Sequence, residues 1–157
     1  LEGDLFGSLS DRLGPNHLGF ARARYDAPQL WTPPPGARHV TMLLMLVSLI
    51  LLASYLFKRS HTAVITHHPM VWSVLLWSAG HLFANGSPAD AVLFGAFLIW
   101  SIADLASAYA RDRRNGAVYP TPELGATAGA VVVGLVLYGV LIGGLHLWLF
   151  GVSPLGM

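Results

Sequence analysis

Residues 40–57, VTMLLMLVSLILLASYLF, form a run without a charged side chain. As an α-helix this run would be roughly 27 Å long, close to the hydrocarbon thickness of a bilayer. Lys58 and Arg59 end it, and three further apolar segments follow at 69–84, 88–110 and 122–150. The pattern predicts an all-α, polytopic membrane helical bundle with four transmembrane helices.

Local signals place the ends of these segments. Pro69 is a favoured residue for a first helical turn, and Asn85 with Gly86 ends the second segment. Ser87 followed by proline predicts the cap of the third segment. The second segment would be only roughly 24 Å long, so it needs a thin bilayer or shielding by its neighbours. The short turn after it makes the second and third segments antiparallel neighbours.

The composition supports a membrane protein and excludes several other classes. Of the 157 residues, 54% are hydrophobic and 11% charged, whereas soluble domains carry about 25% charged residues. The net charge of +1 gives no basis for nucleic-acid binding. The chain has no cysteine, which excludes disulfides and thiolate metal sites. No nucleophilic triad, phosphate-binding loop or dinucleotide fingerprint is present.

The sequence divides into residues 1–39, a polar segment predicted as a linker or surface segment, and residues 40–157, the transmembrane domain. Basic residues lie in the loops after the first and third segments, which predicts a cytoplasmic position for both loops. The fourth segment carries glycines at one-turn spacing, and these favour close helix packing within the bundle over a dimer interface. The glycines are Gly125, Gly129, Gly139 and Gly143.

Histidines are the first candidates for a functional site. With four crossings, His39, His81 and His146 fall in one leaflet, opposite the predicted cytoplasmic loops. Imidazole is the usual axial ligand of haem iron, and a haem can lie between the helices of a bundle. His68 precedes His81 by 13 residues, or about 20 Å along one helix, so these two cannot share a metal. For His39 and His68, a structural role at the membrane surface is the competing interpretation.

Asp104 is the second candidate, because it lies inside the apolar segment 88–110. An acid at that depth usually faces the bundle and finds a partner, and we expect Ser73 and Ser78 to provide hydrogen bonds. The competing interpretation is a carboxylate that reaches the inner interface.

Several motifs resemble the NnrU family over Phe20 to the C-terminus. They are residues 31–35 (WTPPP), 68–70 (HPM), 79–86 (AGHLFANG), 93–95 (LFG) and 151–154 (GVSP). The resemblance implies a bacterial inner-membrane protein associated with nitrite and nitric oxide reduction. The family is similar to 15-cis-zeta-carotene isomerase, a haem b enzyme. His81 matches a haem ligand of that enzyme, and His68 matches its His-Pro motif.

The family usually carries two more N-terminal helices, the first with a histidine that resembles the second haem ligand. Residues 1–20 are polar here and lack them, so His39 or His146 would complete the bis-histidine site. The resemblance thus predicts haem b as cofactor, with His81 as the metal ligand.

Two functions follow as hypotheses. The first is a haem-dependent, isomerase-like enzyme acting on an apolar small molecule, with His68 and Asp104 as catalytic residues. The second is a non-enzymatic assembly or maturation factor for nitrogen-oxide respiration, with other membrane proteins as partners. Both place the chain in membrane lipid. A transporter would need broken helices or inverted repeats, which the sequence does not show.

Overall fold

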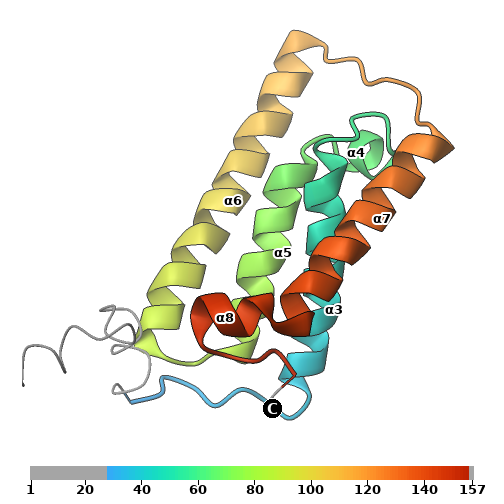
Figure 1. Cartoon of the computed structure of the whole chain (residues 1–157). Helices are drawn as coiled ribbons and strands as arrows, with labels where there is room; N and C mark the ends of the chain where they lie inside the picture. The colour runs from blue at the N-terminus through green and yellow to red at the C-terminus, as the bar shows by residue number, and fades with distance from the viewer. Residues whose placement is uncertain (1–27, 156–157) are drawn as a thin grey trace, which may run out of the picture.

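The structure is a computed structural model that describes residues 28–155, and this part of the chain contains helices and no strands (Figure 1). The all-α prediction is confirmed. The elements are α3 (Ala37–Ser54), α4 (His61–Thr66), α5 (Pro69–Ala84), α6 (Pro88–Asn115), α7 (Leu124–Val140), the π-helix η1 (Leu141–Leu145) and α8 (His146–Phe150).

The predicted boundaries are right where a local signal fixes them. α5 has the predicted bounds, with proline in its first turn. α6 starts as predicted, where the Ser87 hydroxyl accepts a hydrogen bond from the Asp90 backbone N–H. It continues past the predicted end at residue 110 to Asn115, because its basic last turns are good helix formers and Gly116, at φ 60°, ends it. The short helix α4 was not predicted.

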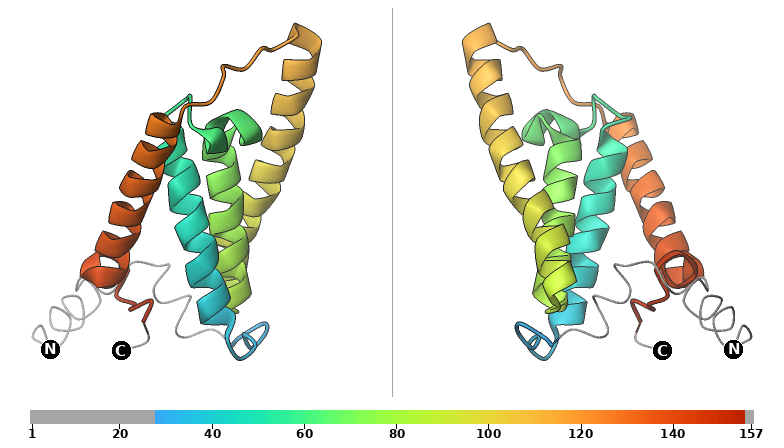
Figure 2. Two further views of the ribbon diagram at one scale, coloured as in Figure 1. Left: turned by 90° about the vertical axis from the view of Figure 1, so that its right-hand side faces the viewer. Right: turned by 90° about the vertical axis from the view of Figure 1, so that its left-hand side faces the viewer.

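The four long helices lie side by side in a row, in the order α6, α5, α3, α7 (Figures 1 and 2). α3 packs on α5 and α7, and α5 packs on α3 and α6. Within the described residues α6 and α7 make no contact with each other, so the row is open and not a closed ring. Figure 2 shows α6 and α7 diverging on the two sides of the central pair.

Three helices are long and apolar enough to cross a membrane: Ala37–Ser54, Pro88–Asn115 and Leu124–Phe150. α5, with 16 residues, is a shorter apolar helix. It lies between α3 and α6, which shield it from lipid on two sides, as expected of a short span. The chain is therefore a membrane protein, and lipid contacts its apolar helices.

Buried serines link the central helices. The Ser48 hydroxyl lies 2.9 Å from the Ser73 carbonyl and 3.0 Å from its hydroxyl, which joins α3 to α5. Ser78 donates to Val74 O within its own helix. The predicted hydrogen bonds from Ser73 and Ser78 to Asp104 are therefore wrong, because the serine hydroxyls are satisfied by backbone and by α3.

Two glycines of α7 allow close packing on α3. A Cβ atom on Gly134 would lie 2.7 Å from Ile50 Cα, and one on Gly129 would lie 2.5 Å from the Phe57 ring. Gly125, Gly139 and Gly143 face open space. The two predicted one-turn glycine pairs are thus not the contact surface, because only Gly129 among them touches a neighbour.

The predicted single helix at 122–150 is broken. Backbone hydrogen bonding changes to the π pattern in η1, and Gly144 adopts φ 140° and ψ −22°, a region open to glycine alone. After this break α8 turns away from the axis of α7 (Figure 1). The turn brings the start of α8 toward the end of α5.

Candidate functional site

The predicted histidines lie toward the two opposite ends of α5. His68 is the N-cap of this helix, and His81 lies in its last turn. Thirteen residues of helix separate the two by about 20 Å, as predicted. The two ends are therefore separate sites with separate surroundings.

His81 and His146 form a pair at one end of the row. Their ring centroids lie 6.4 Å apart and their planes differ by 18°. His81 is held on the central helix α5, whereas His146 is the first residue of α8, directly after the break at Gly144. A straight continuation of α7 would carry His146 elsewhere, so the break positions this side chain.

Backbone carbonyls orient both imidazoles. His81 Nδ1 lies 2.9 Å from Trp77 O, and His146 Nδ1 lies 2.7 Å from Val152 O. A carbonyl only accepts, so each Nδ1 carries a hydrogen, and in the neutral imidazole the lone pair then lies on Nε2. Metal-binding histidines in proteins are commonly oriented by such a hydrogen bond from the second ring nitrogen.

Aromatic rings surround the pair. Phe94 of α6 stacks on His81 at 4.8 Å, and Trp77 lies 5.4 Å from the same ring. Phe150 lies 4.9 Å from His146. Trp77 in turn contacts Phe94 at 5.1 Å. The pair is thus set in an apolar, aromatic environment built from α5, α6 and α8.

His39 shares this end of the molecule but not the pair. The Thr41 hydroxyl donates to Gly80 O at 2.8 Å, which puts the start of α3 beside the end of α5. His39 itself is exposed, and no ring contact among residues 28–155 involves it. Of the two candidates for a second ligand, the structure brings His146 to His81.

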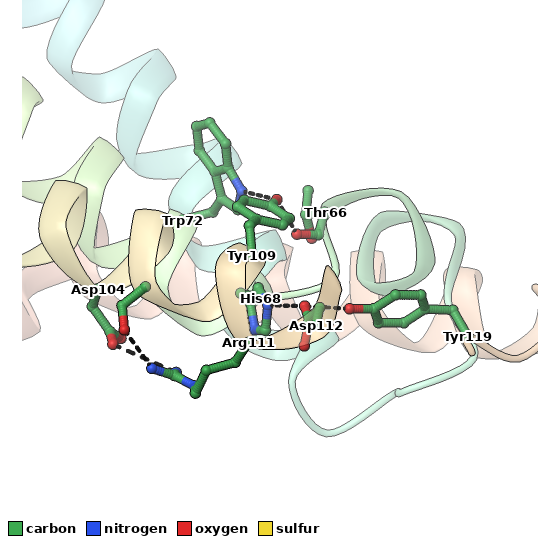
Figure 3. Close-up of polar contacts among 9 residues, drawn as sticks. Thr66, His68, Trp72, Asp104, Tyr109, Arg111, Asp112 and Tyr119 are labelled. Atoms are coloured by element: carbon green, nitrogen blue, oxygen red, sulfur yellow. Dashed lines mark hydrogen bonds and ion pairs between the residues drawn. The ribbon is translucent and has the colours of Figure 1, made fainter. Parts of the chain in front are cut away.

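A polar cluster occupies the other end of α5 (Figure 3). His68 Nε2 lies 2.6 Å from Asp112 Oδ2 in the last turns of α6. The Tyr119 hydroxyl donates to the same carboxylate oxygen at 2.5 Å. One carboxylate therefore joins the start of α5, the end of α6 and the connection formed by residues 116–123.

Aromatic contacts reinforce this cluster. Tyr119 stacks on His67 with centroids 3.6 Å apart and planes 7° apart. The Tyr109 hydroxyl donates to Thr66 O at 2.6 Å and accepts from Trp72 Nε1 at 3.0 Å. His67 has φ 59° and ψ −42°, a strained conformation for a residue with a side chain.

The titration of Tyr119 reflects these surroundings. Burial, and then the hydrogen bond to the Asp112 carboxylate, raise the pKa of Tyr119 to about 12. The phenol therefore stays protonated, and able to donate, throughout the neutral range.

Sequence reasoning did not find Asp112, Tyr119 or His67. Asp112 lies in the basic run 111–114, which was interpreted only as a cytoplasmic loop. The signal that could have indicated Asp112 is its position as the one acidic residue inside this basic run. Nothing in the spacing of Tyr119 indicates that the connection folds back onto α6.

Asp104 lies apart from both groups. It is half-buried on α6, with Oδ1 3.9 Å from Arg111 Nη2 (Figure 3). Phe94, which touches His81, precedes it by ten residues, or about 15 Å of helix. The catalytic role proposed for Asp104 stays a prediction, and its observed partner is Arg111, about two turns further along α6.

The centroid separation of the histidine pair is close to that of two imidazoles bound to one iron. Two imidazole nitrogens on one iron lie roughly 4 Å apart, so the ring centroids lie roughly 6 Å apart, close to the observed 6.4 Å. Within residues 28–155 no group of three or more His, Cys, Asp or Glu side chains could hold a metal ion.

A sequence model of a protein family, described as NnrU protein, matches residues 16–154. The match begins inside the segment 1–39, which sequence reasoning had set apart as a polar region. Comparisons with curated proteins and with solved structures found no match.

Proposed function

The chain belongs to the NnrU family, and from this premise we propose that it is a haem b-binding protein of the bacterial inner membrane. In this proposal His81 and His146 would hold the haem iron. The bound haem would serve reactions of nitrite and nitric oxide reduction or the isomerisation of a polyene. The observation that supports the proposal is the near-parallel pair of imidazoles, 6.4 Å apart and each oriented by a backbone carbonyl.

Each part of the site has a physical role in this proposal. His81, on the central helix, gives a ligand whose position is fixed by packing on both sides. His146 takes its position from the break at Gly144 and from Val152 O. Phe94, Trp77 and Phe150 would exclude water from the pair. Haem iron would supply a redox-active centre, and it would bind a small ligand only where one of the two histidines gives up its position.

His68 is proposed as a proton-transferring group at the opposite end. Its contact with the Asp112 carboxylate supports this role, since a carboxylate partner fixes the orientation of an imidazole. Because His68 lies about 20 Å from His81, it would act at the membrane surface and not on the haem itself.

Absorption spectra test the proposal. The full-length protein, purified from membranes of a haem-producing host, should show a Soret band. His81→Ala should abolish it, and His146→Ala should remove one axial ligand and shift or weaken it. His39→Ala is the matched control, because His39 lies at the same end without contacting the pair, and its spectrum should equal that of the wild type.

Circular dichroism would establish that each variant is folded. If the wild-type protein carried no haem, or if it kept its spectrum in both His81→Ala and His146→Ala, the haem proposal would be refuted. The role of an assembly or maturation factor, with structural histidines, would then become the leading hypothesis.

A further inference from the structure

The connection between α6 and α7 has two fixed points. At its start Tyr119 is bonded to Asp112 and stacked on His67. At its end the Glu123 backbone N–H donates to Arg59 O at 2.7 Å, and the Glu123 carboxylate pairs with the Arg59 side chain. Residues 120–122 lie between these points. Two of the three are proline, and the third, Thr121, accepts hydrogen bonds from Arg59 at its carbonyl and its hydroxyl. Proline fixes φ, so this short piece is stiff.

The connection matters because α6 and α7 do not touch each other in the described part of the chain. They are the outer helices of the row, and residues 116–123 run from the end of one to the start of the other (Figures 1 and 2). α6 is held on α5 and α7 on α3, so the connection acts on the spacing of the two helix ends and not on the packing of the row.

We propose that His68, Asp112 and Tyr119 form a clasp that fixes the spacing between the end of α6 and the start of α7. The clasp joins three separate segments through one carboxylate oxygen, at 2.6 Å from His68 Nε2 and 2.5 Å from the Tyr119 hydroxyl (Figure 3). The strained backbone of His67 beneath the Tyr119 ring favours a second arrangement, because strain persists only while the surrounding contacts hold it.

The size of the change follows from the chain length. Thr121 is held by Arg59 through its carbonyl and its hydroxyl, so only Pro120 is free when the clasp is closed. With the clasp open, Ala117 is still held by its backbone hydrogen bond to Asp112 O, so residues 118–120 are free. At about 3.3 Å per extended residue the reach grows from about 3 Å to about 10 Å. Opening would therefore let the two helix ends separate by up to about 7 Å. This inference concerns helix spacing and does not depend on a bound haem.

Spin labels can measure this spacing, since the chain has no cysteine and labels attach only where one is introduced. Cysteines replacing Asn115 and Leu124, both exposed, place one label at each end of the connection. In reconstituted full-length protein the unmodified clasp should give a narrow distance distribution. Asp112→Ala and Tyr119→Ala should each broaden it and extend it by several ångströms.

Matched controls separate the clasp from general loosening. Asp104→Ala removes an acid from the same helix whose partner is Arg111, and Tyr55→Ala removes an exposed tyrosine at the end of α3. Both should leave the distribution unchanged. Tyr119→Ala alters a residue outside the helices, so it carries the test even if Asp112→Ala does not fold. An unchanged distribution in Tyr119→Ala would overturn the proposal, as would equal broadening in the two controls.

Discussion

A substitution at Gly134 gives the sharpest test of the helix packing. The ideal Cβ of an alanine there would lie 2.7 Å from Ile50 Cα and 2.9 Å from Ile50 N. Both are backbone atoms, so no side-chain rotation can relieve the contact. α7 would have to move away from α3, which packs on it. Gly134→Ala should therefore destabilise the protein.

The expected cost is that of overpacking, about 1–3 kcal/mol. Gly139→Ala is the matched control, because it lies on the same helix and faces open space. Alanine there should be neutral or should stabilise the helix by up to about 1 kcal/mol. Gly129→Ala should fall between them, since its contact is the Phe57 ring, a side chain that can turn.

Reversible unfolding in mixed micelles, followed by circular dichroism, gives the three free-energy differences. The order of stability should be Gly139→Ala, then Gly129→Ala, then Gly134→Ala. A Gly134→Ala protein as stable as Gly139→Ala would show that α3 and α7 do not approach at this point, and the order of helices in the row would need revision.

Three further predictions concern single side chains. Tyr119 should ionise near pH 12, so the stability that its proton contributes is present below about pH 10 and is lost as the pH rises through 12. Asp112→Ala should lower this pKa in an ultraviolet titration, and an unchanged pKa would contradict the contact between the two side chains. Gly144→Ala should cost about 1–3 kcal/mol in thermal unfolding, because its φ of 140° suits glycine alone, and a stable variant would mean that the break does not need it. Ser87→Ala should lower the free energy of unfolding by about 1–2 kcal/mol, since it removes the cap of α6 and the hydroxyl that donates to the Asp90 carboxylate. An unchanged melting temperature would refute this prediction.

The sequence was sufficient for the fold class and for boundaries set by local chemistry. Proline at the start and Asn85-Gly86 at the end define α5 without reference to other helices. The break in the last helix was not predictable in this way. Membrane helices tolerate glycine, so the pattern predicts a packing surface at Gly139 and Gly143 and gives no signal for a break at Gly144. The positive φ of Gly144 depends on the turn into α8, which is a feature of the folded structure.

The ends of the molecule at which the histidines lie were predictable from the sequence, but the contacts that they make were not. Helix direction and residue count place His81 and His146 at one end and His68 at the other. Contacts between segments depend on how the helices are ordered in space, which no spacing along the chain specifies. Asp112 and Tyr119 therefore emerged only from the structure, and so did the choice of His146 over His39 as the neighbour of His81.

The order of the row also bears on how the protein is assembled during synthesis. α3 and α5 are the first long helices made within the described part, and they form the centre. α6 then adds to the free side of α5, and α7 returns to the free side of α3. Each arriving helix thus finds a docking surface already in the bilayer, and no earlier contact has to open for it. A ribosome-bound chain ending after α6 should already contain the α3, α5 and α6 arrangement, with α7 arriving last on the opposite edge.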